Sequence, residues 1–109
     1  MAKIISFKEF QELDLRVGKI LEVRDHPNAD KLILMKIDLG TEVRQAVAGI
    51  RQWYSNEELE GKTVVVIANL EPAVLRGEKS ECMLLAADAS DDVVLLAPEK
   101  PVLPGTKVR

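Results

Sequence analysis

A glycine interrupts the first segment that alternates like a β-strand. In residues 14–25, DLRVGKILEVRD, apolar side chains stand at Leu15 and Val17, Gly18 follows, and the apolar pattern then resumes with a blurred phase. A glycine inside a strand indicates a bulge or a sharp bend. Small barrels use such bends so that one strand serves both sides of the closure. This segment therefore favours a small, closed β structure.

Capping boxes, alternation and turn residues predict the other elements. Ser6 with Glu9, and Ser55 with Glu58, have the spacing of capping boxes, so each pair predicts the start of a short helix. Clean alternation over residues 33–39 predicts a strand. In chain order we predict a helix 6–13, strands 14–25, 33–39 and 43–48, a helix 55–61, a strand 62–69, a long polar connection 70–82, a hairpin of strands 83–87 and 93–97, and an extended tail 98–109.

Three strands, a short helix and further strands are the element order of the OB-fold, a five-stranded Greek-key barrel. We therefore expect an all-β OB-fold barrel with short N-terminal and inter-strand helices and a C-terminal extension. A plain β-sandwich is the main alternative. At 109 residues the chain has the length of one domain, 1–109, with the N-terminal helix inside 1–13 and the extended segment at 98–109.

Composition narrows the class of protein. The longest apolar run, residues 64–68, is far too short to span a bilayer, and the first residues lack the long apolar core of a signal peptide. We expect a cytoplasmic protein without a membrane partner. A single cysteine, Cys82, allows no internal disulfide, and one cysteine with one histidine cannot assemble a usual zinc site. No metal and no cofactor are expected.

Catalysis has little support among the residues. His26 and Cys82 are the residue types of a nucleophile and its base, but the sequence offers no orienting third group and no oxyanion hole. We interpret His26 as a turn residue of the stretch HPNADKL, and we expect no catalytic residues. Carboxylates are the residue type for acid–base or Mg²⁺ chemistry, but the candidates of this chain stand in charged loops, where solvated surface charge is the commoner explanation. They are Asp25, Asp30, Glu78 and Glu81.

Basic residues suggest a binding surface. The formal net charge is −3, with +1 in residues 1–54 and −4 in residues 55–109, so a polyanionic partner requires a local basic patch. In an OB-fold the exposed face of strands two and three and the flanking loops bind oligonucleotides. Lys31, Arg44, Arg76 and Lys79 fall on that predicted face and its rim. The alternative is that they are solubilising surface charges.

Aromatic residues are scarce, which argues against an unstructured single strand as ligand. Single-strand binders of this fold carry several stacking rings. Here Phe7 and Phe10 have helical spacing that fits packing against the barrel or a partner subunit, and Trp53 with Tyr54 is expected to plug the barrel end. A folded RNA read by its shape and backbone fits better.

Four blocks in order resemble the tRNA-binding domain family: DLRVGKILEVRDHPNADKL, VAGI, GKTVVVIANLEP and LRGEKSECMLLAA. That family includes the C-terminal domain of many methionyl-tRNA synthetases, free-standing structure-specific tRNA-binding proteins and a bacterial export-associated chaperone. The resemblance covers about residues 6–108. It implies a non-catalytic homodimer that binds the outer corner of tRNA with little dependence on sequence, as the C-terminal domain or β subunit of a methionyl-tRNA synthetase. The alternative implied function is a chaperone or protein-interaction module that uses the same groove.

The same resemblance assigns the contact residues. Lys31, Asn69, Ser80 and Met83 match the tRNA-contact positions, and Arg76 and Lys79 match auxiliary phosphate contacts. Two positions depart from the family pattern, since Glu71 and Val74 stand where many members have basic residues, and this lowers the positive charge of the binding rim. Cys82 also stands where a small or polar residue is usual.

Overall fold

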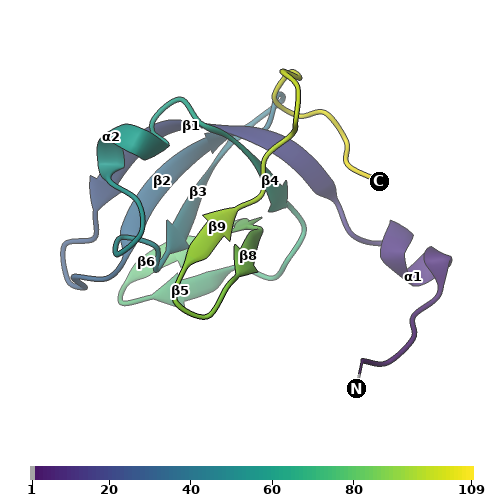
Figure 1. Cartoon of the computed structure of the whole chain (residues 1–109), viewed down its shortest axis with the longest axis horizontal. Coiled ribbons are helices and arrows are strands. Elements are labelled where there is room, and N and C mark those ends of the chain that lie inside the picture. The colour runs from purple at the N-terminus through teal and green to yellow at the C-terminus, as the bar shows by residue number, and fades with distance from the viewer. Residues whose placement is uncertain (1) are drawn as a thin grey trace.

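The computed structural model describes residues 2–109 and shows a strongly curved antiparallel sheet (Figure 1). Its five strands follow the order β3-β2-β1-β4-β7 and close most of the way into a barrel. The predicted all-β class with an OB-like barrel is therefore confirmed. The elements are α1 Phe7–Gln11, β1 Leu15–Asp25, β2 Ile33–Asp38, β3 Val43–Ala48, α2 Asn56–Leu59, β4 Thr63–Ile67, β5 Ala73–Leu75, β6 Glu78–Ser80, β7 Met83–Leu84, β8 Ala86–Asp88 and β9 Val93–Leu95.

Strand β1 serves both sides of the barrel. Its first half pairs with β4 and its second half pairs with β2. A Cβ atom at Gly18 would lie 2.6 Å from the Cγ2 of Ile37, so a larger residue would push β2 away from β1. The register shift between β1 and β2 comes between Ile20 and Glu22, slightly beyond the glycine that predicted it.

The barrel interior is filled by side chains from the strands and from α2, whose only buried residue is Leu59. Trp53 and Tyr54 pack against this core, at the edge where α2 begins. The indole N–H of Trp53 donates to the carbonyl oxygen of Asp91 at 3.1 Å, and the Tyr54 hydroxyl accepts from the backbone N–H of Leu95 at 3.1 Å. These two side chains therefore attach the β8–β9 hairpin to the barrel.

The prediction of a long polar connection over residues 70–82 is wrong in part, because this segment contains a β-hairpin. Strands β5 and β6 pair through Ala73↔Ser80, Val74↔Lys79 and Leu75↔Glu78. The turn uses Arg76 at φ 53° and Gly77 at φ 89°, which is the left-handed pair that a tight hairpin turn requires. Each of these strands has only three residues, which is too short for an alternating pattern to be recognised in the sequence.

The last predicted hairpin is also divided. Met83 and Leu84 form β7, which pairs with β4 as the fifth barrel strand, and only β8 pairs with β9. The change of partner takes place at Leu85, whose N–H donates to the Val65 carbonyl while its own carbonyl accepts from Leu96. One predicted strand therefore belongs to two sheets.

The C-terminal segment lies along the free edge of the first half of β1. Val17 donates to the Thr106 carbonyl at 2.8 Å, and its own carbonyl accepts from the N–H of Gly105 at 2.7 Å. Val108 donates to the Leu15 carbonyl at 2.8 Å. The predicted extended tail therefore does more than cover the surface, because it completes the hydrogen bonding of an otherwise open strand edge.

Helix α1 stands away from the barrel (Figure 1). Both predicted capping boxes are present, with Ser6 capping α1 and Ser55 capping α2. No residue of α1 is buried, and Phe7 is 71% exposed. Within residues 2–109 no helix is long and apolar enough to cross a membrane.

Candidate nucleic-acid interface

The turn 26–32 is joined to the β5–β6 hairpin by the imidazole of His26. The backbone N–H of Asn28 donates to Nδ1 at 2.9 Å, so Nδ1 carries no proton and Nε2 carries it. Nε2 lies 2.9 Å from the carbonyl oxygen of Leu75 and donates to it. Because both ring nitrogens are occupied by backbone groups in a buried site, the structure supports the interpretation of His26 as a turn residue.

An open groove lies between β3, the β5–β6 hairpin and β7. It encloses about 330 Å³. Its walls are mostly apolar, with Ser80, Glu71 and Glu81 as the polar contributions. The residues that define this groove are Val47, Ala48, Leu75, Ser80, Met83 and Leu84, with Glu71 at its rim.

Three of the predicted contact residues lie on segments next to this groove, although none of them lines it. Arg76 directly follows the groove residue Leu75, and Lys79 directly precedes Ser80. Lys31 lies against the end of β3, because a Cβ atom on Gly49 would be 3.8 Å from its carbonyl oxygen. All three side chains are exposed, and none forms an ion pair within residues 2–109.

Ser80 and Met83 both line the groove but in different ways. The Ser80 hydroxyl accepts from the Val47 N–H at 3.0 Å and donates to the Cys82 carbonyl at 3.2 Å. It therefore substitutes for a strand partner at the edge of β3. Met83 is 49% exposed and offers its thioether to a ligand.

Gln45 joins the edge of β3 to residues 78–81 and forms hydrogen bonds with the acidic residues beside the groove. Its carbonyl accepts from the Glu81 N–H at 2.8 Å, and its N–H donates to a Glu81 carboxylate oxygen at 3.3 Å. Its side-chain amide donates to Glu78 at 3.3 Å and to the Lys79 carbonyl at 2.9 Å. The sequence did not single out Gln45, since a polar residue in an alternating strand carries no signal of its partner.

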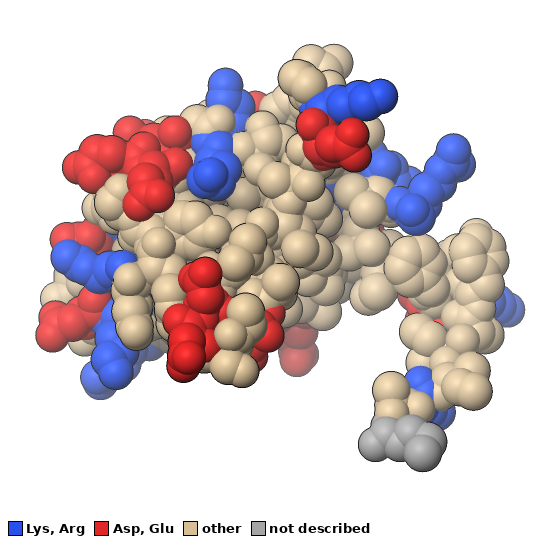
Figure 2. Space-filling view, in the orientation of Figure 1, with Lys and Arg blue, Asp and Glu red and all other residues tan. Residues whose placement is uncertain are grey.

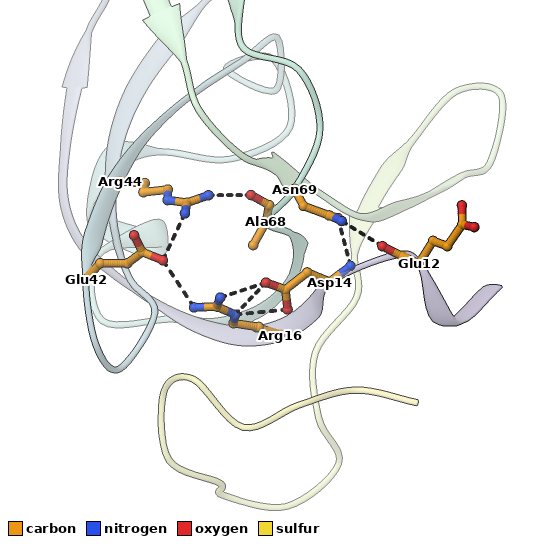
Figure 3. Close-up of polar contacts among 7 residues, drawn as sticks. All are labelled: Glu12, Asp14, Arg16, Glu42, Arg44, Ala68 and Asn69. Carbon is orange, nitrogen blue, oxygen red and sulfur yellow. Dashed lines mark hydrogen bonds and ion pairs between the residues drawn. The ribbon is translucent and has the colours of Figure 1, made fainter. Parts of the chain in front are cut away.

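Arg44 does not line the groove. Its guanidinium donates to the carbonyl oxygen of Ala68 and to Glu42 at 2.9 Å (Figure 3). Glu42 also accepts from Arg16 at 3.3 Å, and Arg16 holds Asp14 at 2.6 Å. Arg44 is therefore held in a network of fixed charges, unlike the three cations around the groove.

The same network changes the ionisation of its members. The hydrogen bond from Arg16 lowers the pKa of Asp14 below its ordinary value, and the bond to Asp14 raises the pKa of Arg16. Asp14 directly precedes β1 and Arg16 is the second residue of that strand, so the two have the i, i+2 spacing that places side chains on one face of an extended backbone.

Asn69 lies at the junction between α1 and β1. Its side-chain oxygen accepts from the Asp14 N–H at 2.7 Å, and its side-chain nitrogen donates to the Glu12 carbonyl at 2.7 Å (Figure 3). The neighbouring Ala68 N–H donates to the Asp14 carbonyl at 2.8 Å. The amide of Asn69 thus fixes the direction in which α1 leaves the barrel.

Cys82 is buried in the groove wall, and burial raises the pKa of its thiol to about 11. A thiolate nucleophile is therefore disfavoured at neutral pH. In the part of the chain that the structure describes, no cluster of three or more His, Cys, Asp or Glu side chains is arranged to hold a metal ion.

Surface charge is mixed on the face shown in Figure 2. Acidic side chains cover α2 and the turn between β8 and β9. Basic and acidic side chains alternate at the end of the molecule where the turn 26–32 and the β5–β6 hairpin meet. A polyanion would therefore be met by a local set of cations and not by a uniformly positive face.

Comparison with known proteins places these features in a family. A family model described as a putative tRNA binding domain matches residues 15–107. A methionine–tRNA ligase of Pyrococcus horikoshii is 58% identical over 105 residues, which is 96% of this chain and 14% of the ligase. The chain therefore spans about one seventh of the length of the curated relatives that it matches.

Solved structures with a similar fold include a protein related to methionyl-tRNA synthetase and a chaperone. The crystal structure of a methionyl-tRNA-synthetase-related protein from Pyrococcus horikoshii has a TM-score of 0.92 at 31% identity, and the match covers 99% of this chain and 100% of that chain. The chaperone CsaA of Bacillus anthracis str. Ames has a TM-score of 0.87 at 33% identity, covering 98% of this chain and 100% of that chain.

Proposed function

Because the chain belongs to the putative tRNA-binding domain family, we propose that it is a non-catalytic module that binds tRNA through its shape and backbone. It acts in the cytoplasm as a homodimer, as the C-terminal domain or the β subunit of a methionyl-tRNA synthetase. It holds tRNA while the catalytic unit charges it. No step of the chemistry is assigned to its own residues.

One observation carries this proposal. Lys31, Arg76 and Lys79 come from two segments far apart in the sequence, and the contact between His26 and Leu75 holds these segments together. Exposed cations without ion pairs are available to phosphate oxygens, and neutralising phosphates is the main source of nucleic-acid affinity that is independent of sequence. Phosphate contacts position an RNA without reading its bases, which accounts for binding many tRNAs alike.

Three cations on one protomer are few for tight binding, so the dimer is part of the proposal. Helix α1 and the residues before it expose a row of apolar side chains, with Ile4 94%, Ile5 52% and Phe7 71% exposed. On the C-terminal extension Leu103 is 80% exposed. A second copy that covers this apolar surface removes it from water. The paired protomers then present two sets of cations, and the second set binds at a raised effective concentration.

A gel shift against bulk tRNA at low and at physiological salt tests the function. Binding through phosphates weakens steeply with salt, by the number of counterions released. Loss of the shift at the higher salt, with its return on dilution, supports the proposal. Absence of a shift at both salt concentrations contradicts it, as does preference for one tRNA by more than about tenfold, about 1.4 kcal/mol.

A chaperone or protein-interaction module is the second candidate. The apolar walls of the groove, with Leu75 and Met83 exposed, favour it, because such walls also accept the side chains of an unfolded peptide. Salt separates the two candidates. Peptide bound on apolar surface keeps its affinity as salt rises, whereas tRNA loses it.

A further inference from the structure

The groove is shaped for something smaller than an RNA backbone. Its volume of about 330 Å³ lies at the lower end of the range of small-molecule sites, which suits one compact group. The groove is open to solvent, and apolar side chains that would be expected inside a protein stand exposed on its walls. Leu75 is 37%, Leu70 41% and Met83 49% exposed.

The walls suit a flat ring. Leu70, Leu75 and Leu84 contribute apolar surface to the lining, and a thioether such as that of Met83 makes favourable contacts with aromatic rings. The groove contains no aromatic residue that would prefer to stack in it from within the chain. An unpaired nucleobase is a ring of this kind, and folded RNAs display such bases in their loops and ends.

Charge decides between a base and a peptide side chain. Arg76 and Lys79 belong to the β5–β6 hairpin that forms one wall of the groove, and Lys31 belongs to the turn that His26 joins to this hairpin. None of the three is ion-paired within residues 2–109. A nucleotide brings a phosphate on each side of its base, and these phosphates match the surrounding cations. An apolar peptide side chain brings no such charge, so it leaves the cations unused.

Glu71 at the rim adds selectivity. Its side chain is exposed and forms no hydrogen bond or ion pair among the described residues, so both carboxylate oxygens are free to accept. Guanine offers a ring N–H and an exocyclic amino group side by side, which fits a carboxylate in a bidentate way. Uracil offers a single ring N–H between two carbonyl oxygens, and those oxygens repel a carboxylate.

We propose that the groove takes one unpaired base of the bound RNA between Leu75 and Met83, and that Glu71 makes guanine bind there more tightly than uracil. This inference rests on the proposed tRNA binding and adds a base site to it. It also explains how an acidic residue, Glu71, contributes to a surface that is proposed to bind phosphates. The carboxylate lowers the phosphate affinity of the rim and in exchange reads the edge of the base.

Fluorescence anisotropy and NMR with short RNAs test the site. The probes are heptauridylate RNAs whose central residue is uridine, guanosine, inosine or an abasic ribose, each titrated to millimolar concentration, with bulk tRNA measured alongside. Guanosine is expected to bind at least about fivefold more tightly than uridine, the low end for a bidentate contact between a side chain and a base. Inosine lacks the amino group and should lose most of that gain, and the abasic RNA should bind most weakly.

Two variants locate the effect. Glu71→Gln should reduce the ratio between guanosine and uridine toward one, while the matched control Glu60→Gln, at the exposed end of α2 and outside the groove, should leave it unchanged. The methyl resonances of Leu75 and Met83 should shift with guanosine RNA and not with the abasic RNA.

Each other outcome contradicts the base site. Equal binding of all four RNAs, or no shift of the groove methyl groups at millimolar RNA, overturns it even when bulk tRNA binds in a salt-dependent way, and the proposed function then stands alone. Displacement of the guanosine RNA by an apolar peptide that does not compete with bulk tRNA shows that the groove is a peptide site. If bulk tRNA itself does not bind, the proposed function and the base site are both wrong.

Discussion

The imidazole Nε2 of His26 lies 2.9 Å from the carbonyl oxygen of Leu75, and this contact joins the turn between β1 and β2 to the β5–β6 hairpin. The two residues are 49 positions apart in the chain. The turn carries Lys31 and the hairpin carries Arg76 and Lys79. The imidazole thus links the segment that carries Lys31 to the segment that carries Arg76 and Lys79.

Replacing this imidazole should loosen the hairpin without unfolding the barrel. His26→Ala removes two hydrogen bonds and leaves the Leu75 carbonyl without its partner, which typically costs about 1–3 kcal/mol of unfolding free energy. Amide hydrogen exchange should rise in residues 75–79, and tRNA affinity should fall. Wild-type exchange rates in the hairpin together with unchanged affinity would show that the contact positions nothing.

Lys31 should account for about one phosphate contact. Lys31→Ala is expected to weaken tRNA binding and to reduce the slope of log affinity against log salt by about one contact. The matched control is Lys100→Ala, an exposed lysine on the C-terminal segment. Slopes that are equal in the two variants would remove Lys31 from the set of contacts.

Gly105 should be intolerant of a side chain. It has φ +89°, and a Cβ atom there would lie 2.6 Å from the Leu39 carbonyl oxygen. Gly105→Ala therefore combines the strain of the left-handed backbone, about 1–2 kcal/mol, with a clash that pushes the C-terminal segment away from the turn between β2 and β3. Gly61→Ala is the control, because Gly61 has φ +83° with nothing within 4 Å of the added atom. Thermal unfolding should show a larger loss for Gly105→Ala, and equal losses would mean that the close approach has no energetic role.

The ion pair of Asp14 and Arg16 should make stability depend on acid pH. Because the folded protein lowers the pKa of Asp14 from 3.8, the pair stabilises the fold above about pH 4, and this contribution is lost as the pH falls through the lower folded value. Asp14→Asn should flatten the curve of unfolding free energy against pH between 5 and 2. Asp92→Asn, in the exposed β8–β9 turn, serves as the comparison. A curve for Asp14→Asn as steep as that of the wild type would assign the acid sensitivity to other carboxylates.

Asn69 should control the direction of α1. In Asn69→Ala the Asp14 N–H and the Glu12 carbonyl lose their partner, so amide exchange in α1 should rise. The proposed homodimer should then dissociate at a higher protein concentration than it does in the wild type. Sedimentation over a concentration series measures the second effect. Asn56→Ala is the control, since its side-chain amide contacts only the exposed carboxylate of Asp25 at 3.2 Å. An unchanged dimer with weaker tRNA binding would instead indicate that Asn69 contacts the RNA directly.

Local patterns were sufficient for the larger elements. The alternation of β2, the glycine in β1 and the two capping boxes each depend on neighbouring residues, and the structure contains all of them. The β5–β6 hairpin was missed because its strands are short and exposed, and its turn places Arg76 in the left-handed region, where a glycine or asparagine is the usual signal. Binding of RNA by Lys31, Arg76 and Lys79 stays a prediction. The structure shows that the two segments that carry them are joined by the contact between His26 and Leu75.

Other site residues needed the folded chain. Arg44 and Asn69 were predicted as contact residues together with Lys31, Arg76 and Lys79. In the structure the guanidinium of Arg44 is part of a charge network, and the side-chain amide of Asn69 forms two hydrogen bonds with the backbone. Gln45 and Ser80 gave no sign that they close the barrel edge. Apart from Glu42, which is two residues from Arg44, these partners lie 24 to 57 residues away along the chain, so no local window contains them.

Residue spacing within short segments and motifs in a fixed order were enough to predict the longer strands, the helix starts and the family. Which charged side chains lack an ion-pair partner became visible only in the folded chain. A guanidinium or an amide is available to a ligand only when no carbonyl or carboxylate of the folded chain has already bound it. That depends on distances between segments, as the contact between His26 and Leu75 illustrates, and those distances exist only once the barrel has closed.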